Sequence, residues 1–154
     1  MAVLILGIGN ADCGDDAVGR IVARRLKRHR LDQCTVSEQN GDGSMLMETW
    51  KDHETVILVD AVSSGAPPGT IHRLEAHARP VPVAFFRCST HAFGVGEAIE
   101  LARAMNRLPS RLIMYGIEGK QFGIGTDLST EIEAAAQEVM ERVIQDLKGS
   151  PASS

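Results

Sequence analysis

Residues 3–10 read Val3-Leu4-Ile5-Leu6-Gly7-Ile8-Gly9-Asn10, an apolar run that closes in a glycine turn. A short apolar run followed by a tight turn is typical of a buried β-strand. Apolar residues then recur at helical spacing from Ala17 to about Arg28, so the turn leads into an amphipathic helix. A strand, a glycine turn and a helix in this order indicate the first unit of an α/β fold.

The alternation of strands and helices continues along the chain. The patterns predict strands at 35–37, 56–59, 81–86 and 112–117, a short helix at 44–50, and helices over 94–105 and from Thr130 to Gly149. Thr130 and Glu133 can form a capping box at the start of the last helix. The expected fold is therefore a three-layer α/β/α domain with a mainly parallel twisted sheet, in which residues 70–74 are compatible with one antiparallel strand.

The length of the chain, 154 residues of which 44% are hydrophobic, suits one compact domain. We expect this α/β domain to span residues 1–149, and residues 150–154 to form a disordered tail because they read Ser-Pro-Ala-Ser-Ser. The net charge of -4 gives no general attraction for nucleic acid or anionic membrane. The apolar stretches are far shorter than the roughly 18 residues of a membrane span.

The three cysteines show neither a disulfide framework nor a CxxC spacing, which fits a reducing cytoplasm. A basic cluster over residues 24–30 follows Asp15 and Asp16 by about three helical turns. Its simplest interpretation is that cations lie at the C-terminus of the first helix and carboxylates at its N-terminus. We expect a monomeric cytoplasmic protein.

The glycine turn invites comparison with dinucleotide-binding loops, in which backbone N–H groups approach a pyrophosphate. The third glycine position is occupied by Asp12, and Asp15 and Asp16 lie where phosphates would sit. Like charges would repel such a ligand. The sequence therefore argues against a nucleotide site.

Two carboxylates and one imidazole follow three of the apolar runs. Asp16 comes after residues 3–6, Asp60 after 56–59, and His91 after 83–86. If these runs are neighbouring parallel strands, their carboxyl ends open onto one crevice, where open α/β sheets bind ligands. Carboxylate and imidazole are ligands for a divalent metal. We predict a metal site made of Asp16, Asp60 and His91.

Each of these residues also has an ordinary structural interpretation. Asp15 or Asp16 can cap the first helix, Asp60 can open a turn by bonding its own backbone, and one histidine among five is commonly structural. One Asp suffices for a cap, which leaves the other free to face the crevice. Glu118, in a glycine-rich link before the last helix, is a candidate for supporting the metal ligands.

Taken in order, several motifs resemble those of the hydrogenase maturation endopeptidases, and the resemblance spans nearly the whole chain. They are Gly7-Ile8-Gly9-Asn10, Gly14-Asp15-Asp16-Ala17-Val18-Gly19, Leu58-Val59-Asp60-Ala61, Ser89-Thr90-His91, Gly116-Ile117-Glu118 and Leu128-Ser129. The resemblance implies that Asp16, Asp60 and His91 bind the metal. One departure is that several members carry Asp-Gly-Gly-Thr where this chain has Gly41-Asp42-Gly43-Ser44. The role of that Asp is not carried over.

The activity implied by the resemblance is removal of a C-terminal peptide from the large-subunit precursor of a nickel-iron hydrogenase after nickel insertion. The nickel would arrive with the large-subunit precursor, so the three residues would bind only a precursor that already contains nickel. Another divalent metal is compatible with the same ligands. Asp16 is the candidate general base of this hydrolase, because two nearby carboxylates tend to raise one pKa. Two alternatives stay open: a nickel-binding accessory protein without protease activity, and a general metal-dependent peptidase.

Overall fold

The structure is a computed structural model that describes residues 3–9, 14–29, 31, 34–82, 93–120 and 127–153. Its elements in chain order are β1 (Val3–Ile8), the 3-10 helix η1 (Gly14–Ala17), α1 (Val18–Arg28), β2 (Cys34–Gln39), the 3-10 helix η2 (Gly43–Met45), α2 (Leu46–Trp50), β3 (Thr55–Val62), β4 (Ile71–Glu75), α3 (Val95–Ala104), β5 (Arg111–Glu118) and α4 (Thr130–Ser153). Most predicted elements are present. The strand expected at 81–86 lies, apart from its first two residues, outside the described part of the chain.

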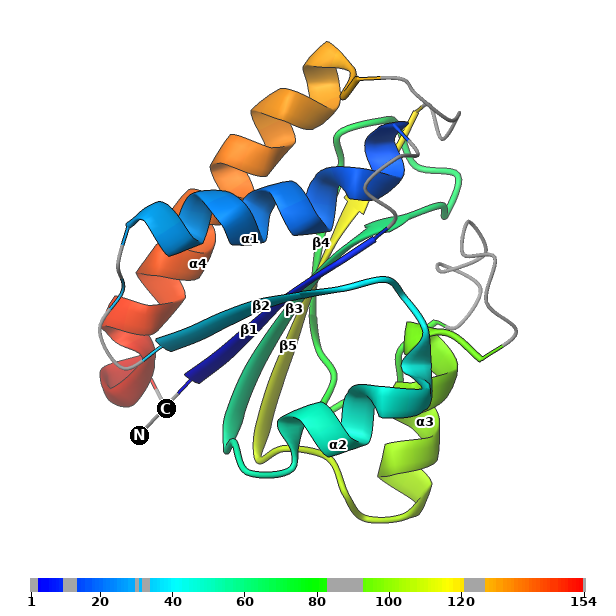
Figure 1. The fold of residues 1–154 in the computed structure, drawn as a ribbon, viewed down its shortest axis with the longest axis vertical. Helices are drawn as coiled ribbons and strands as arrows, with labels where there is room; N and C mark the ends of the chain where they lie inside the picture. Colours follow the sequence, from blue (N-terminus) through cyan, green and yellow to red (C-terminus); the bar gives the residue numbers. More distant parts are fainter. Residues whose placement is uncertain are drawn as a thin grey trace.

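The described strands form one mixed sheet with the order β2-β1-β3-β5-β4 (Figure 1). Strands β2, β1, β3 and β5 are parallel, whereas β4 runs antiparallel to β5. This confirms the predicted mainly parallel sheet and the antiparallel strand near residues 70–74. The chain leaves β1 toward β2 on one side and returns to β3 on the other, so the strand order reverses between β1 and β3.

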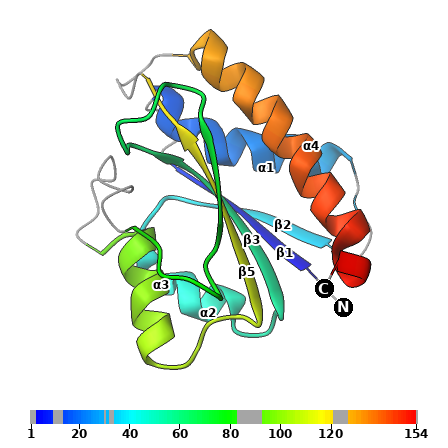
Figure 2. The same ribbon diagram turned by 180° about the vertical axis from the view of Figure 1, so that it is seen from behind.

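Helices cover both faces of the sheet, which confirms the three layers. Helices α1 and α4 lie on one face, and α2 and α3 on the other (Figures 1 and 2). Side chains alternate between the faces along each strand. In β3, Ile57 and Val59 pack in the α1/α4 core, while Leu58 and Val62 pack in the α2/α3 core. By the same alternation, Asp60 belongs to the α2/α3 side.

Both ends of helix α4 differ from the sequence prediction. The backbone N–H groups of Ile132 and Glu133 donate to the carbonyl of Ser129, and the Glu133 carboxylate binds Arg25 of α1 at 2.7 Å instead of closing a capping box with Thr130. The Glu133 side chain thus contacts a neighbouring helix and not the first turn of its own helix. The backbone of α4 also continues past Gly149 to Ser153, into the predicted tail. Gly149 alone costs the helix only about 1 kcal/mol, so it is a weak stop signal.

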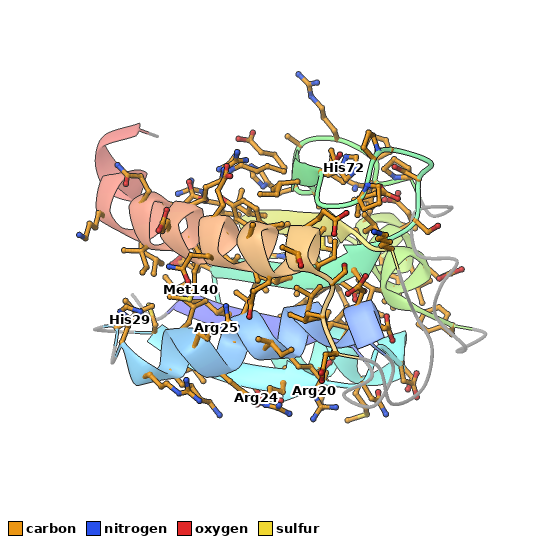
Figure 3. All side chains as sticks on the ribbon, turned by 90° about the horizontal axis from the view of Figure 1, so that it is seen from above. Arg20, Arg24, Arg25, His29, His72 and Met140 are labelled. Atoms are coloured by element: carbon orange, nitrogen blue, oxygen red, sulfur yellow. The ribbon has the colours of Figure 1, made fainter. Side chains whose placement is uncertain are left out.

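Arg24 and Arg25 of the basic cluster, together with Arg20 one turn earlier in α1, form ion pairs with other elements. Arg20 and Arg24 both contact the Glu38 carboxylate of β2 at 3.0 Å, along the outer side of α1 (Figure 3). These pairs fasten α1 to the edge strand β2. Among the described residues, no helix combines the length and the apolar character that crossing a bilayer would require.

Candidate functional site

The predicted site lies where the strand order reverses. Strand β1 ends at Ile8, and η1 with Asp16 follows within a few residues, while the neighbouring parallel strand β3 carries Asp60 near its carboxyl end. In open α/β sheets this is the position of the ligand crevice. The topology therefore brings Asp16 and Asp60 to the same end of two adjacent strands, as the sequence predicted.

Three glycines allow η1 and α1 to approach the sheet closely. A Cβ atom on Gly9, whose φ is 152°, would lie 1.9 Å from the carbonyl oxygen of Asp16. A Cβ atom on Gly7 would lie 2.2 Å from the carbonyl oxygen of Gly19, and one on Gly19 would lie 2.2 Å from that of Val59. The glycines of the first turn thus serve backbone packing, which accounts for a glycine-rich turn without a nucleotide ligand.

Asp60 is one of the few carboxylates buried in the described structure, with 7% of its surface exposed. It does not follow β3 but lies within it, paired in register with Gly116 of β5, because β3 continues beyond the apolar run of residues 56–59 to Val62. Burial raises the pKa of Asp60 well above 3.8, the charge of Asp16 raises this pKa further, and the backbone N–H of Ala61, 2.8 Å from Oδ1, opposes both. The surroundings of Asp60 thus make its ionised form less favourable than in water, and a nearby cation would offset this effect.

Asp15 and Asp16 take different roles from the predicted helix cap. The N-cap position of α1 is Ala17, which makes no side-chain cap hydrogen bond. Asp15 is fully buried and accepts hydrogen bonds from Lys120 and Ser129 at the far ends of the β5–α4 connection. Asp16 is partly exposed and lies close enough to Asp60 for its charge to act on that carboxyl. Only one of the two carboxylates, Asp16, belongs to the predicted site.

The third predicted ligand, His91, lies outside the described residues, as does the strand expected before it. Within the described ranges, no group of three or more His, Cys, Asp and Glu side chains could hold a metal ion. The described part of the site is therefore a pair of carboxylates. Such oxygen donors suit a divalent cation.

Glu118, predicted as a possible support for the metal ligands, binds elsewhere. Its carboxylate is 3% exposed and accepts hydrogen bonds from the Ser64 backbone N–H and hydroxyl, at 2.8 and 2.6 Å. His72 Nε2 of β4 lies 3.1 Å from Oε1. Burial acts to raise the pKa of Glu118, but the hydrogen bonds from Ser64 and His72 outweigh it and lower the pKa below 4.5. Glu118 thus joins the β3–β4 connection and β4 to the end of β5.

The pKa of Glu118 gives a testable pH dependence. Because the folded-state pKa is lowered, the stabilising contribution of the carboxylate is complete above 4.5 and is lost as pH falls through the lowered value. We expect Glu118→Gln to reduce the free energy of unfolding at neutral pH by about 1.5–3 kcal/mol, the range for hydrogen bonds to charged groups. The difference from the wild type should shrink in acid, as measured by urea unfolding across pH.

A matched control for Glu118→Gln is Glu75→Gln. Glu75 is an exposed carboxylate of β4, where it pairs with Arg73. We expect the control to change stability by at most about 0.5 kcal/mol, because exposed ion pairs contribute little. If Glu118→Gln kept the same deficit from neutral to acid pH, the carboxylate would not be the titrating group.

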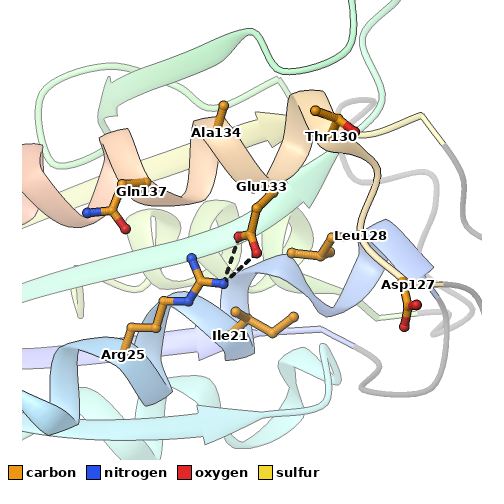
Figure 4. A pocket seen from close by; sticks show the side chains of 8 residues that line it. All are labelled: Ile21, Arg25, Asp127, Leu128, Thr130, Glu133, Ala134 and Gln137. Carbon is orange, nitrogen blue, oxygen red and sulfur yellow. Dashed lines mark hydrogen bonds and ion pairs between the residues drawn. The ribbon is translucent and has the colours of Figure 1, made fainter.

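The groove between α1 and α4 is separate from this site. It has a volume of about 840 Å³, and its lining includes Ile21, Leu128 and the Arg25–Glu133 ion pair (Figure 4). Neither Asp16 nor Asp60 lines it. The ion pair spans the groove from one helix to the other, which fits a role in packing α4 against α1.

The chain is similar to known proteins over most of its length. A family model described as hydrogenase maturation protease (HycI) matches residues 20–146. The hydrogenase 2 maturation protease of Escherichia coli K12 is 28% identical over 154 residues, which is 97% of this chain and 93% of that protein. The hydrogenase expression/formation protein HupD of Thiocapsa roseopersicina is 27% identical over 148 residues, which is 94% of this chain and 67% of that protein.

A solved structure shares the fold. The solution structure of an endopeptidase from Escherichia coli superimposes with a TM-score of 0.82 at 24% identity, over 97% of this chain and 94% of that one. The region matched by the family model includes Asp60 and His91, and Asp16 lies four residues before its start.

Proposed function

The chain belongs to the hydrogenase maturation protease family, and on that premise we propose that it removes the C-terminal peptide of a nickel-iron hydrogenase large-subunit precursor once nickel has been inserted. Membership of the family makes it a maturation endopeptidase. The proposal adds the substrate, the bond that is cut and the recognition of nickel. We also propose that the protein is a cytoplasmic monomer that binds neither nucleic acid nor membrane.

The observation that carries the proposal is the pairing of Asp16 with Asp60 at the reversal point of the sheet. Two carboxylates within electrostatic range of each other, one of them buried, favour uptake of a positive charge, because the charge of Asp16 and burial both raise the pKa of Asp60. A divalent cation supplies that charge better than a proton, because both carboxylates can then be ionised. In the proposal, His91 adds a third ligand from outside the described residues.

The nickel ion is treated as part of the substrate. Oxygen and imidazole ligands accept nickel, zinc and manganese alike, so three protein ligands alone do not select the metal. A precursor that brings its own nickel and further ligands would complete the coordination shell, and the enzyme would then bind only a loaded substrate. This accounts for a site with few protein ligands.

The chemistry follows from the different environments of the two carboxylates. A precursor-bound nickel ion would polarise the scissile carbonyl or an attacking water. Asp16, which is partly exposed, is the proposed general base that takes the proton of that water. Asp60, which is buried, would hold the metal as the ionised carboxylate.

Mass spectrometry of three mixtures tests the proposal. The protein should remove a short C-terminal peptide from nickel-loaded large-subunit precursor, and it should leave nickel-free precursor and short generic peptides uncut. Cleavage of generic peptides would instead indicate a general metal-dependent peptidase. Binding of the loaded precursor without cleavage would indicate an accessory protein, and equal cleavage of both precursors would exclude recognition through nickel.

A further inference from the structure

Asp15 is a buried carboxylate with a different set of partners from Asp16. Its exposed fraction is 0%, and Oδ2 accepts a hydrogen bond from the Lys120 backbone N–H at 2.8 Å. Oδ1 accepts one from the Ser129 backbone N–H at 2.9 Å, and the Ser129 hydroxyl lies 3.0 Å from Oδ2. One carboxylate thus joins η1 to the second residue after β5, Lys120, and to the residue before α4, Ser129. Its negative charge also lies at the N-terminus of α4, where the helix dipole favours it.

Asp15 and Asp16 point in different directions because they are neighbours in a 3-10 helix. With 3.0 residues per turn, successive side chains are rotated by about 120°. When Asp15 is fixed toward Lys120 and Ser129, Asp16 is directed away from them. The charge of Asp16 acts on Asp60, whose pKa it raises.

The backbone of η1 is also held from the side of the sheet. The carbonyl of Asp16 rests against Gly9, where a Cβ atom would lie 1.9 Å from its oxygen. Gly19 at the start of α1 packs against the carbonyl of Val59, the residue before Asp60. These contacts limit the translation of η1 toward the sheet, and the hydrogen bonds of Asp15 limit its rotation. Together they determine where the Asp16 carboxylate lies relative to Asp60.

We propose that Asp15 is a positioning residue that orients Asp16 toward Asp60 by anchoring η1 to both ends of the β5–α4 connection. This inference rests on the proposed function, because it assigns Asp16 a role in cleavage. Asp15 itself contacts neither substrate nor metal. Its contribution is the orientation of a neighbouring carboxylate, and displacements of about 1 Å in an active site can slow a reaction by about 100-fold.

The test uses Asp15→Asn. The amide keeps one acceptor oxygen but turns an N–H donor toward either Lys120 or Ser129, so one anchor is lost without leaving a cavity. We expect kcat/KM for nickel-loaded precursor to fall by about 10- to 100-fold. The carboxylate is already displaced in an Asp16→Glu background. There, the fall in log kcat/KM caused by Asp15→Asn should be less than about a third of its fall in the wild type, because the two residues act as one unit.

Asp146→Asn is the matched control. Asp146 of α4 accepts hydrogen bonds from the buried Tyr115 hydroxyl and from Arg73, away from η1. The control should lower the melting temperature as Asp15→Asn does, yet keep kcat/KM within about threefold below that temperature.

A second measurement does not depend on cleavage. In ¹³C NMR spectra of the full-length protein, the carboxyl signals of Asp16 and Asp60 should shift in Asp15→Asn and stay in place in Asp146→Asn. Unshifted signals, full activity of Asp15→Asn, or equal losses in the wild-type and Asp16→Glu backgrounds would each overturn the inference. Failure of the wild type to cut loaded precursor would instead refute the proposed function, and the NMR comparison would still decide the role of Asp15.

Discussion

Replacing Asp60 with Asn is expected to abolish cleavage of nickel-loaded precursor and at the same time to raise the melting temperature. The loss follows because a neutral amide cannot supply the charge that would hold the metal opposite Asp16. The gain follows because burial and the charge of Asp16 both disfavour ionised Asp60 in the folded protein. Asparagine keeps an oxygen for the Ala61 N–H bond and has no charge to bury.

The pH dependence of the Asp60→Asn effect has a definite sign. The folded-state pKa of Asp60 lies well above 3.8, so the wild type loses stability as pH rises from 3.8 toward the raised value. The advantage of the variant in melting temperature should therefore grow from acid to neutral pH. Calorimetry measures this shift, and mass spectrometry of the precursor measures cleavage.

Asp146→Asn is the control, and it should have the opposite effects on melting temperature and cleavage. It removes a carboxylate that binds Tyr115 and Arg73, so it should lower the melting temperature and retain cleavage. Asp16→Asn and His91→Ala should abolish cleavage as Asp60→Asn does. Full processing by a folded variant at any of these three positions would exclude that residue from the site.

Replacing Gly19 with Ala is expected to cause a large loss of stability, although a glycine to alanine change inside a helix usually stabilises by about 1 kcal/mol. The added Cβ atom would lie 2.2 Å from the carbonyl oxygen of Val59 and 2.3 Å from that of Ile8. Both obstacles are backbone atoms of central strands, so neither can rotate away. We expect a loss of about 3 kcal/mol, at the upper end of the usual range for overpacking.

Thermal unfolding measures this loss as a fall in melting temperature of about 6–12 °C for a chain of this size. Gly65→Ala is the control, because nothing lies within 4 Å of its added Cβ atom. Gly65 has a φ of 91°, so the control should still cost about 1–2 kcal/mol from backbone strain. A stability of Gly19→Ala at or above that of the control would show that α1 can move away from the sheet at little cost.

The local pattern of the sequence was sufficient for most of the fold. Apolar runs predicted β1, β3 and β5, helical spacing predicted α1, α3 and α4, and turn residues around 63–69 predicted the returning strand β4. These elements follow from periodicity, because a buried strand or an amphipathic helix needs apolar side chains at fixed intervals. The predicted metal site depended on the same reasoning, since parallel strands place Asp16 and Asp60 at one edge of the sheet.

The predicted helix caps were wrong where a side chain binds a residue that is distant in the sequence. Glu133 binds Arg25 of α1 in place of the capping box, and Asp15 anchors Lys120 and Ser129 in place of capping α1. In both cases the residues in contact are at least 105 positions apart in the sequence. A motif that spans four residues carries no information about such contacts.

The sequence by itself determined the alternation of strands and helices and the mainly parallel sheet, and it predicted Asp16, Asp60 and His91 as a metal site. Only the tertiary structure showed that Asp15 is buried in hydrogen bonds to Lys120 and Ser129, whereas Asp16 is partly exposed. Only the tertiary structure also assigned the glycines of the first turn to close backbone contacts with η1 and α1. The physical reason is that hydrophobic periodicity is a property of neighbouring residues, whereas burial, charge repulsion and hydrogen-bond satisfaction depend on segments that meet only after folding.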